Sequence, residues 1–562
     1  MLTRIFFKVF LLIFFVSLNL NAAIKDPVKA ENGMVVSASE LASKVGADIL
    51  KKGGNAVDAS VAVGFALAVT FPYAGNIGGG GFMVIHLEDG LNTSIDYREK
   101  APAKAHRDMY LDDEKNVISG MSTEGWSSGG VPGSVAGMIY ALEKYGTLSL
   151  KEVIKPAIEL AANGFPLSYR MANDINGFRE YFLMYESSKK IFTNKGQPKV
   201  EGEMFVQTDL ANTLKLIKEN GRDGFYKGNV AELIVKQSGE LGGFIEIEDL
   251  ENYEPVEREP ITGEYKDYKF ISMPPPSSGG IALAQALNII ENFNFEKNEW
   301  GSSRYIHTVS EVLKYVYADR SQHLGDEDFY NVPKEWLTSE KYAEEIASKI
   351  GDIAVPSKEI LPCDIPIYES NETTHYSVVD KFGNAVSVTT TINSGYGSKV
   401  VVDGAGFLLN NEMDDFSAKP GVPNQFGLLG NEANSIQPNK RMLSSMSPTI
   451  VTKNDKPYIV IGSPGGSRII TTVLQVILNC IDFGMDIQEA IDMPRFHHQW
   501  MPDRIDYEKF GMSGDVKKSL ENRGQTIGIE TVVGRAQGIM VDKNGTLWGA
   551  SDSRGFGKAI GY

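Results

Sequence analysis

The chain has 562 residues, of which 42% are hydrophobic and 23% are charged, an ordinary composition for a packed globular protein. It can bury a large core, so disorder, collagen and coiled coil are excluded as descriptions of the whole chain. The formal net charge of −17 makes the chain a poor general binder of nucleic acid, because phosphate groups repel an acidic surface.

Residues 1–23 have the layout of a secretory signal peptide. Arg4 and Lys8 precede an apolar run at 9–16, and a stretch of small residues ends at Ala22-Ala23. The apolar run is short for a membrane span, and an uncleaved anchor is the alternative. We therefore expect a periplasmic or secreted protein with no stable membrane span after signal removal.

The middle of the chain, from about 134 to 350, is mostly helical in pattern, and two helices and a strand are expected before it. Residues 39–50 have helical spacing of apolar side chains, and the alanine-rich run 56–69 predicts a buried helix. A strand is expected at 82–86, and a loop at 274–280. Further helices are expected at 135–145, 150–162, 210–219 and 282–292.

After Glu372 the pattern changes to short β-branched strands. Residues 375–379 and 385–392 alternate with period two and are joined by a turn at 380–384. Further strands are expected at 406–409, 448–452 and 458–462, and a long apolar helix at 469–483. No internal repeat or linker interrupts the chain, so we expect one large domain, a layered α/β sandwich.

The cysteines and histidines do not form a recognisable metal motif. Two cysteines, Cys363 and Cys480, exclude a disulfide-rich scaffold and leave open one disulfide or two buried thiols. None of the seven histidines lies in an HExxH pattern, and the adjacent pair His497-His498 lacks the spacing that places two rings on one helix face. We expect no metal site.

Thr373 is a candidate nucleophile if the chain is cut between Glu372 and Thr373. A threonine hydroxyl is weak without a base beside it, but the cut would give Thr373 a free α-amine. The reference pKa of that amine is about 7.7–8.0, so it can take the proton from its own hydroxyl near neutral pH.

The register of the predicted hairpin gathers polar residues near Thr373. A three-residue loop at 381–383, with Gly383 at the position that needs positive φ, pairs Asp380 with Asn384. Thr373 then falls opposite Thr391, and Asn393 lies on the same face. The alternative interpretation is that these threonines are simply good strand formers.

A glycine-rich turn at 462–467 separates a predicted strand from a predicted helix. The backbone N–H groups at such a helix start converge on an anion, so Gly465 and Gly466 can form an oxyanion hole. No nucleotide-binding pattern G-x-x-x-x-G-K-[ST] or G-x-G-x-x-G occurs there. A structural turn is the alternative, and solvated loops are the alternative for the polar segments 410–415 and 443–447.

In this combination the sequence resembles the γ-glutamyltranspeptidases (glutathione hydrolases), members of the N-terminal nucleophile hydrolase superfamily. The resemblance runs from about residue 24 to residue 562. It is carried by Asp96-Tyr97-Arg98-Glu99, Thr373-Thr374-His375-Tyr376-Ser377, 410–416, 438–448 and 462–468.

The resemblance implies an αββα four-layer sandwich of the α/β (α+β) class and a precursor that cuts itself between Glu372 and Thr373. The large subunit, 24–372, and the small subunit, 373–562, would stay together as a heterodimer in one compact domain. Thr373 would be the nucleophile, Thr391 would hydrogen-bond its hydroxyl, and Gly465 and Gly466 would hold the oxyanion. No cofactor is implied.

The resemblance also implies a pocket for a γ-glutamyl group, which has a free α-carboxylate and a free α-ammonium. Arg98, Ser444 and Ser445 would bind the carboxylate. The acceptors for the ammonium would be Asn393, Glu412 and Asp415. Residues 420–434 match a lid, in which Phe426 stands where some members have tyrosine.

The implied activity is transfer of the γ-glutamyl group of glutathione and related compounds to water, an amino acid or a dipeptide. A cephalosporin or glutaryl acylase is the close alternative, although it predicts loss of acids such as Glu412 and Asp415. A non-catalytic extracellular γ-glutamyl-binding protein is another alternative. A serine hydrolase is suggested only by G-x-S-x-G at 125–129, which no clear strand precedes.

Overall fold

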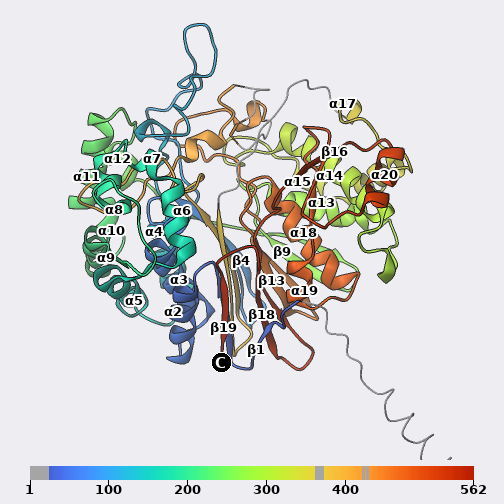
Figure 1. The fold of residues 1–562 in the computed structure, drawn as a ribbon, viewed down its shortest axis with the longest axis horizontal. Helices are drawn as coiled ribbons and strands as arrows, with labels where there is room; N and C mark the ends of the chain where they lie inside the picture. The colour runs from blue at the N-terminus through green and yellow to red at the C-terminus, as the bar shows by residue number, and fades with distance from the viewer. Residues whose placement is uncertain (1–23, 361–372, 420–423, 426–429) are drawn as a thin grey trace, which may run out of the picture.

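The structure is a computed structural model that describes residues 24–360, 373–419, 424–425 and 430–562. Two seven-stranded sheets, whose neighbouring strands are all antiparallel, lie face to face between two layers of helices (Figure 1). The expected αββα sandwich is therefore confirmed.

The first sheet contains the hairpin that follows Thr373. Its strand order is β19 (Lys558–Gly561), β2 (Gly33–Ser37), β10 (Thr374–Asp380), β11 (Ala385–Thr391), β3 (Gly80–His86), β4 (Asn92–Asp96) and β7 (Val256–Arg258). The second sheet has the order β1 (Val28–Ala30), β18 (Leu547–Ser551), β17 (Gln537–Val541), β13 (Lys456–Gly462), β12 (Thr449–Lys453), β9 (Tyr268–Ser272) and β8 (Ile261–Tyr265).

Helices cover the outer face of each sheet. Over the first sheet lie α2 (Glu40–Lys51), α3 (Ala56–Thr70), α4 (Ser134–Tyr145), α5 (Leu150–Asn163) and α9 (Thr208–Asn220), and over the second lie α13 (Gly279–Ile290), α14 (Ser303–His323), α18 (Arg468–Ile481) and α19 (Ile487–Asp492) (Figure 1). Every residue of α3 is buried, as its all-round apolar pattern predicts. Within the described residues no helix has both the length and the apolar character needed to cross a bilayer.

Smaller elements complete the structure. The remaining helices are α6 (Tyr169–Gly177), α7 (Arg179–Phe182), α8 (Glu186–Phe192), α10 (Asp223–Tyr226), α11 (Gly228–Glu240), α12 (Ile247–Glu251), α15 (Lys334–Leu337), α16 (Glu340–Lys349), α17 (Ser357–Ile360) and α20 (Gly514–Asn522), with short 3₁₀ turns at η1 (Trp126–Ser128), η2 (Lys297–Glu299), η3 (Glu412–Asp415) and η4 (Glu432–Asn434). Two small sheets are formed by β5 (Phe165–Pro166) with β6 (Met204–Phe205), and by β14 (Phe496–His497), β15 (Ile505–Tyr507) and β16 (Ile527–Glu530).

Most of the predicted elements are present, with three corrections. The strand expected at 406–409 is wrong: Leu408 forms only an isolated bridge with Val401, because Gly406 turns the chain at a φ of 78°. The loop expected at 274–280 ends two residues earlier, since α13 begins at Gly279. The segment 256–272, within the mostly helical part, forms β7, β8 and β9.

The inner face of the β10–β11 hairpin carries polar side chains into the space between the sheets. The His375 ring contacts the Thr389 hydroxyl at 2.9 Å and the Ser377 hydroxyl at 3.0 Å, and Ser377 donates to the Gln537 carbonyl at 3.1 Å. Burial lowers the pKa of His375 to about 3, so the ring is neutral. Tyr376 and Val378, on the other face, pack in the apolar core that includes α3.

Gly462 in β13 allows His375 to lie between the sheets. A Cβ at this position would lie 2.3 Å from Nδ1 of His375, whose ring is fixed by hydrogen bonds on both nitrogens. We expect Gly462→Ala to destabilise the protein by about 1–3 kcal/mol, because the neighbours must shift. A lowered midpoint of thermal unfolding would be the measurement.

Gly239→Ala, near the end of α11, is the matched control. A Cβ there would meet nothing within 4 Å, and Gly239 lies in a helix with no positive φ. The midpoint of thermal unfolding of this variant should therefore equal or exceed that of the wild type. A wild-type midpoint for Gly462→Ala would mean that the two sheets do not pack at this spacing.

Candidate active site

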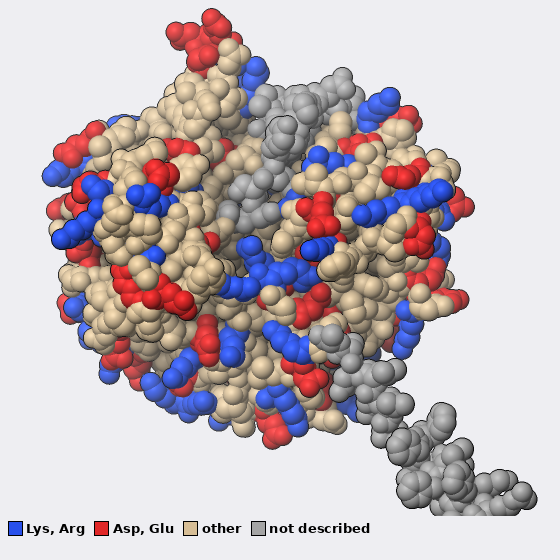
Figure 2. Space-filling model, in the orientation of Figure 1, with Lys and Arg blue, Asp and Glu red and all other residues tan. Residues whose placement is uncertain are grey.

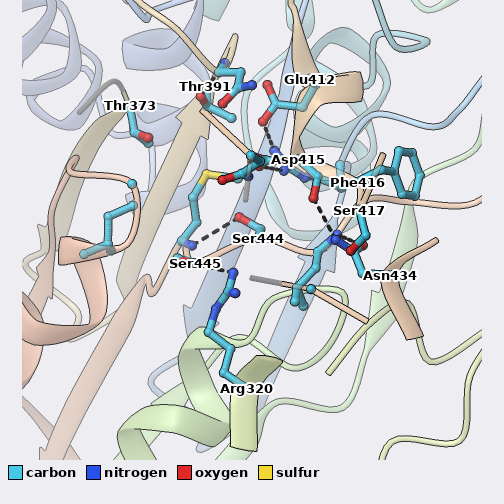
Figure 3. Close-up of a pocket in the computed structure, with 18 residues that line it drawn as sticks. Arg320, Thr373, Thr391, Glu412, Asp415, Phe416, Ser417, Asn434, Ser444 and Ser445 are labelled. Atoms are coloured by element: carbon cyan, nitrogen blue, oxygen red, sulfur yellow. Dashed lines mark hydrogen bonds and ion pairs between the residues drawn. The ribbon is translucent and has the colours of Figure 1, made fainter. Parts of the chain in front are cut away.

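The β10–β11 hairpin has the predicted register. Thr374 pairs with Thr390, the pairing continues to Val379 with Ala385, and Gly383 in the turn has a φ of 95°. One further step along this register places Thr373 opposite Thr391. Both residues line one cavity at the end of the first sheet (Figure 3).

Segments far apart in the sequence converge on this cavity. Arg98 follows the end of β4, Asn393 follows β11, and η3 contributes Glu412 and Asp415. Ser444 and Ser445 lie before β12, and Gly466 lies before α18. The structure thus brings together every predicted substrate-binding residue with Thr373, Thr391 and Gly466.

The glycine turn between β13 and α18 requires glycine for conformational reasons. Gly465 has a φ of 142° and Gly466 a φ of 53°, both in the region that L side chains rarely adopt. Gly466 lines the cavity, whereas Gly465, directly before it, is not part of the lining. The roles of both residues as oxyanion donors stay a prediction.

Arg98 is fully buried among three carboxyl groups. Its guanidinium pairs with Glu412 and with Asp415, and a Glu99 oxygen lies 3.6 Å from Nη1. Burial disfavours the charge of Arg98, but these neighbours raise its pKa above the ordinary value. The two predicted halves of the substrate pocket, cation and acids, therefore pair with each other in this structure.

Three carboxyl groups surround the single guanidinium of Arg98, so some of these carboxyl groups retain their protons. Burial raises the pKa of Glu99 to about 7 and that of Glu412 well above its ordinary value. Neither oxygen of the Glu99 carboxyl group has a hydrogen-bond partner in the part of the chain that the structure describes. The cavity holds only about 30 Å³ of free space, so a ligand must replace the contacts of Arg98 rather than add to them.

Arg320 is a pocket residue that the sequence reasoning missed. It lies on α14, is 4% exposed, and donates from Nη2 to the Ser445 hydroxyl and from Nε to the Ser278 hydroxyl, both at 3.0 Å. Ser278 in turn donates to the Ser444 carbonyl at 2.7 Å. Within the described residues no carboxylate pairs with Arg320, and burial lowers its pKa to about 10. No local sequence pattern marks this arginine as a pocket residue.

Asn393 and the lid are only partly defined by the structure. Asn393 has a φ of 70° and donates from Nδ2 to the Asn411 carbonyl at 2.9 Å. Phe426, the predicted lid residue, and Glu372, before the predicted cut, lie outside the described residues. Asn424 and Gly430, which flank the Phe426 segment, line the cavity.

The other candidate residues do not assemble into a second site of the predicted kinds. Ser127 of the G-x-S-x-G match lies in η1 and donates to the Met121 carbonyl at 2.7 Å, not to a histidine. His497 contacts Thr471 at 2.8 Å, and His498 lies 3.3 Å from Asp503. The described residues contain no cluster of three or more potential metal ligands. Cys480 is buried, and Cys363 lies outside the described residues.

Comparison with known proteins agrees with this geometry. The chain is 53% identical over 542 residues to the glutathione hydrolase proenzyme of Escherichia coli (strain K12), covering 96% of this chain and 93% of that one. A crystal structure of cephalosporin acylase from Bacillus halodurans superposes with a TM-score of 0.85 at 28% identity, covering 98% of this chain and 99% of that chain.

A crystal structure of Helicobacter pylori γ-glutamyltranspeptidase is 48% identical, with a TM-score of 0.58, and covers 61% of this chain and 96% of that chain. The family profile described as gamma-glutamyltranspeptidase matches residues 42–562. The chain therefore belongs to the γ-glutamyltranspeptidase family.

Proposed function

We propose that this chain is the precursor of a γ-glutamyl transferase and glutathione hydrolase that cuts itself between Glu372 and Thr373. The observation that carries the proposal is the shared cavity: Thr373, directly before the interior strand β10, lines the same space as a buried guanidinium and carboxyl groups. Those charges complement the free α-amino acid end of a γ-glutamyl compound.

The proposed reaction uses Thr373 as nucleophile and base. The α-amine takes the proton of the Thr373 hydroxyl as the oxygen attacks the γ-carbonyl, and the N–H groups of Gly465 and Gly466 stabilise the oxyanion. Thr391 fixes the hydroxyl. The C–N bond breaks, the amine leaves with the proton, and a γ-glutamyl ester remains on Thr373. Water, or the amine of an amino acid or dipeptide, then attacks the ester, and no cofactor takes part.

Specificity follows from an exchange of ion pairs in the pocket. The substrate α-carboxylate pairs with Arg98 and accepts hydrogen bonds from Ser444 and Ser445. The substrate α-ammonium donates to the acceptors Asn393, Glu412 and Asp415. An ordinary α-linked peptide lacks the free carboxylate and ammonium, so it would leave buried charges unpaired. Glu412 and Asp415, together with the 53% identity to a glutathione hydrolase, favour this activity over that of an acylase.

The sheet topology supports two subunits, 24–372 and 373–562, that stay together after the cut. In the first sheet β19, β10 and β11 come after residue 373, and β2 lies between β19 and β10 although it comes before residue 373, as do β3, β4 and β7. In the second sheet β1, β8 and β9 come before residue 373 and flank the four strands that come after it. The backbone hydrogen bonds of both sheets therefore join the pieces. The expected large subunit is about three fifths of the chain, the share that the H. pylori chain covers.

The proposed location is the periplasm or the extracellular space. It rests on the signal-like residues 1–23, which lie outside the described residues. The proposed partners are small γ-glutamyl donors and amine acceptors, and the net charge of −17 disfavours nucleic acid.

Thr373→Ala should remain a single chain and should not turn over γ-glutamyl-p-nitroanilide, because the variant lacks the hydroxyl that both reactions need. Gel electrophoresis of the purified protein measures the cut, and N-terminal sequencing of the smaller band should begin at Thr373 in the wild type.

Thr374→Val is the matched control, since the adjacent threonine is on the helix-facing side and its hydroxyl has no hydrogen-bond partner among the described residues. The control should be cut normally. Two bands from Thr373→Ala would refute the nucleophile assignment.

Arg98→Lys should be cut normally but should raise KM for γ-glutamyl-p-nitroanilide by about ten- to a hundredfold, because a point charge replaces a two-pronged contact. The wild type should also discriminate against 4-aminobutyryl-p-nitroanilide, which lacks the α-carboxylate. A wild-type KM in Arg98→Lys would contradict the assigned role.

A further inference from the structure

A second cavity meets the active site at Thr373. It has a volume of about 270 Å³, and its lining includes Thr373, Pro464, Arg535 and Phe556. The glycine turn separates it from the first pocket, since Pro464 lines the second cavity and Gly466 lines the first. A reacting carbonyl held between Thr373 and this turn therefore has space on two sides.

The second cavity continues into a larger one of about 660 Å³ beside α6. The two share Arg170, Asp174 and Phe556 in their linings. Together they offer more room than the γ-glutamyl pocket, with its 30 Å³. Figure 2 shows basic side chains gathered in the middle of the face between the two helical layers.

The charge of the second cavity is suited to an anion. Three arginines contribute to its lining, and Arg554 is neutralised by Glu508 at 2.6 Å and Asp552 at 3.0 Å. Arg170 donates to the Gly555 carbonyl at 2.7 Å and stacks on Phe556, but no carboxylate pairs with it in the described chain.

Arg535 is the least satisfied of the three arginines. Its guanidinium forms no hydrogen bond or ion pair with the described residues, and its Nε is buried without a partner. Asp174 is the one acid among the described lining residues; it accepts a hydrogen bond from the Tyr396 hydroxyl at 3.0 Å, and burial raises its pKa to about 6. Arg170 and Arg535 thus form no ion pair with the described residues, and the single lining acid, Asp174, lies close enough to Arg535 for the guanidinium to act against the rise in its pKa.

We propose that this cavity binds the part of the donor beyond the scissile amide, and that Arg535 binds its terminal carboxylate. The proposal rests on the proposed function and assigns the chemical class of the leaving group, a dipeptide with a free carboxylate. The amine that attacks the ester must approach from the side on which the first amine left, so an anionic dipeptide acceptor uses the same cavity.

The reach of Arg535 fits such a ligand. Its backbone N–H donates to the Ser463 hydroxyl at 2.9 Å, so the residue starts beside the glycine turn. Two extended residues span about 7 Å from amide nitrogen to terminal carboxylate. Because Thr373 and Arg535 line the same cavity, a ligand of this length that starts at Thr373 can extend along it toward the guanidinium.

The test compares kcat/KM for glutathione with that for its glycinamide, in which a neutral amide replaces the terminal carboxylate. The self-cleaved wild type should prefer glutathione by about tenfold or more, the effect of one charge-assisted contact. Arg535→Gln should reduce this preference toward one, and Arg535→Lys should retain part of it. Arg523→Gln, which removes an arginine paired with Asp352 near α20, should keep the wild-type preference.

The outcomes separate this proposal from the proposed function. Turnover of neither compound, nor of γ-glutamyl-p-nitroanilide, would refute the function itself. Equal kcat/KM values for glutathione and its glycinamide in the wild type would overturn only the carboxylate site. If either Arg535 variant preferred glutathione over its glycinamide as strongly as the wild type does, the role of Arg535 would be overturned.

Discussion

The central position of β10 in the first sheet is the constraint on which the site depends. All seven residues of this strand are buried, and it is hydrogen-bonded to β2 on one side and β11 on the other. A slip of one residue would turn Tyr376 toward the polar space between the sheets and His375 toward the apolar core beneath α3. The register that is stabilised by this packing also directs Thr373 into its cavity, so the core and the nucleophile are fixed by the same hydrogen bonds.

The buried charges around Arg98 explain how a closed pocket can still accept a charged ligand. Removing a charge from water is costly unless a partner replaces the lost hydration. Here each ionic group of the expected substrate has a counterpart that is already paired, Arg98 with Glu412 and Asp415. Binding exchanges one set of partners for another and leaves the number of pairs similar. Ligands with only one of the two charges would leave a buried group uncompensated.

The sequence predicted those parts of the molecule that depend on local chemistry. Gly383 in a short turn determined the hairpin register, and the all-round apolar pattern of α3 identified a buried helix. The strand predicted at 406–409 was wrong because apolar residues there pack from an irregular segment. β8 was missed because it lies at the sheet edge and has only one buried residue, Tyr265. Arg320 was missed because its role depends on where α14 packs, which no local pattern reveals.

The two cavities beside Thr373 differ in ways that predict unequal selectivity along one substrate. Arg98 is fully buried and must exchange its pocket acids for the ligand carboxylate, so an imperfect ligand loses interactions that water cannot replace. Arg535 is only half-buried in a larger cavity, where water and salt can compensate for a missing carboxylate. Recognition should therefore be strict for the γ-glutamyl group and graded for the amine, which is the combination that an enzyme with one acyl donor class and many acceptors requires.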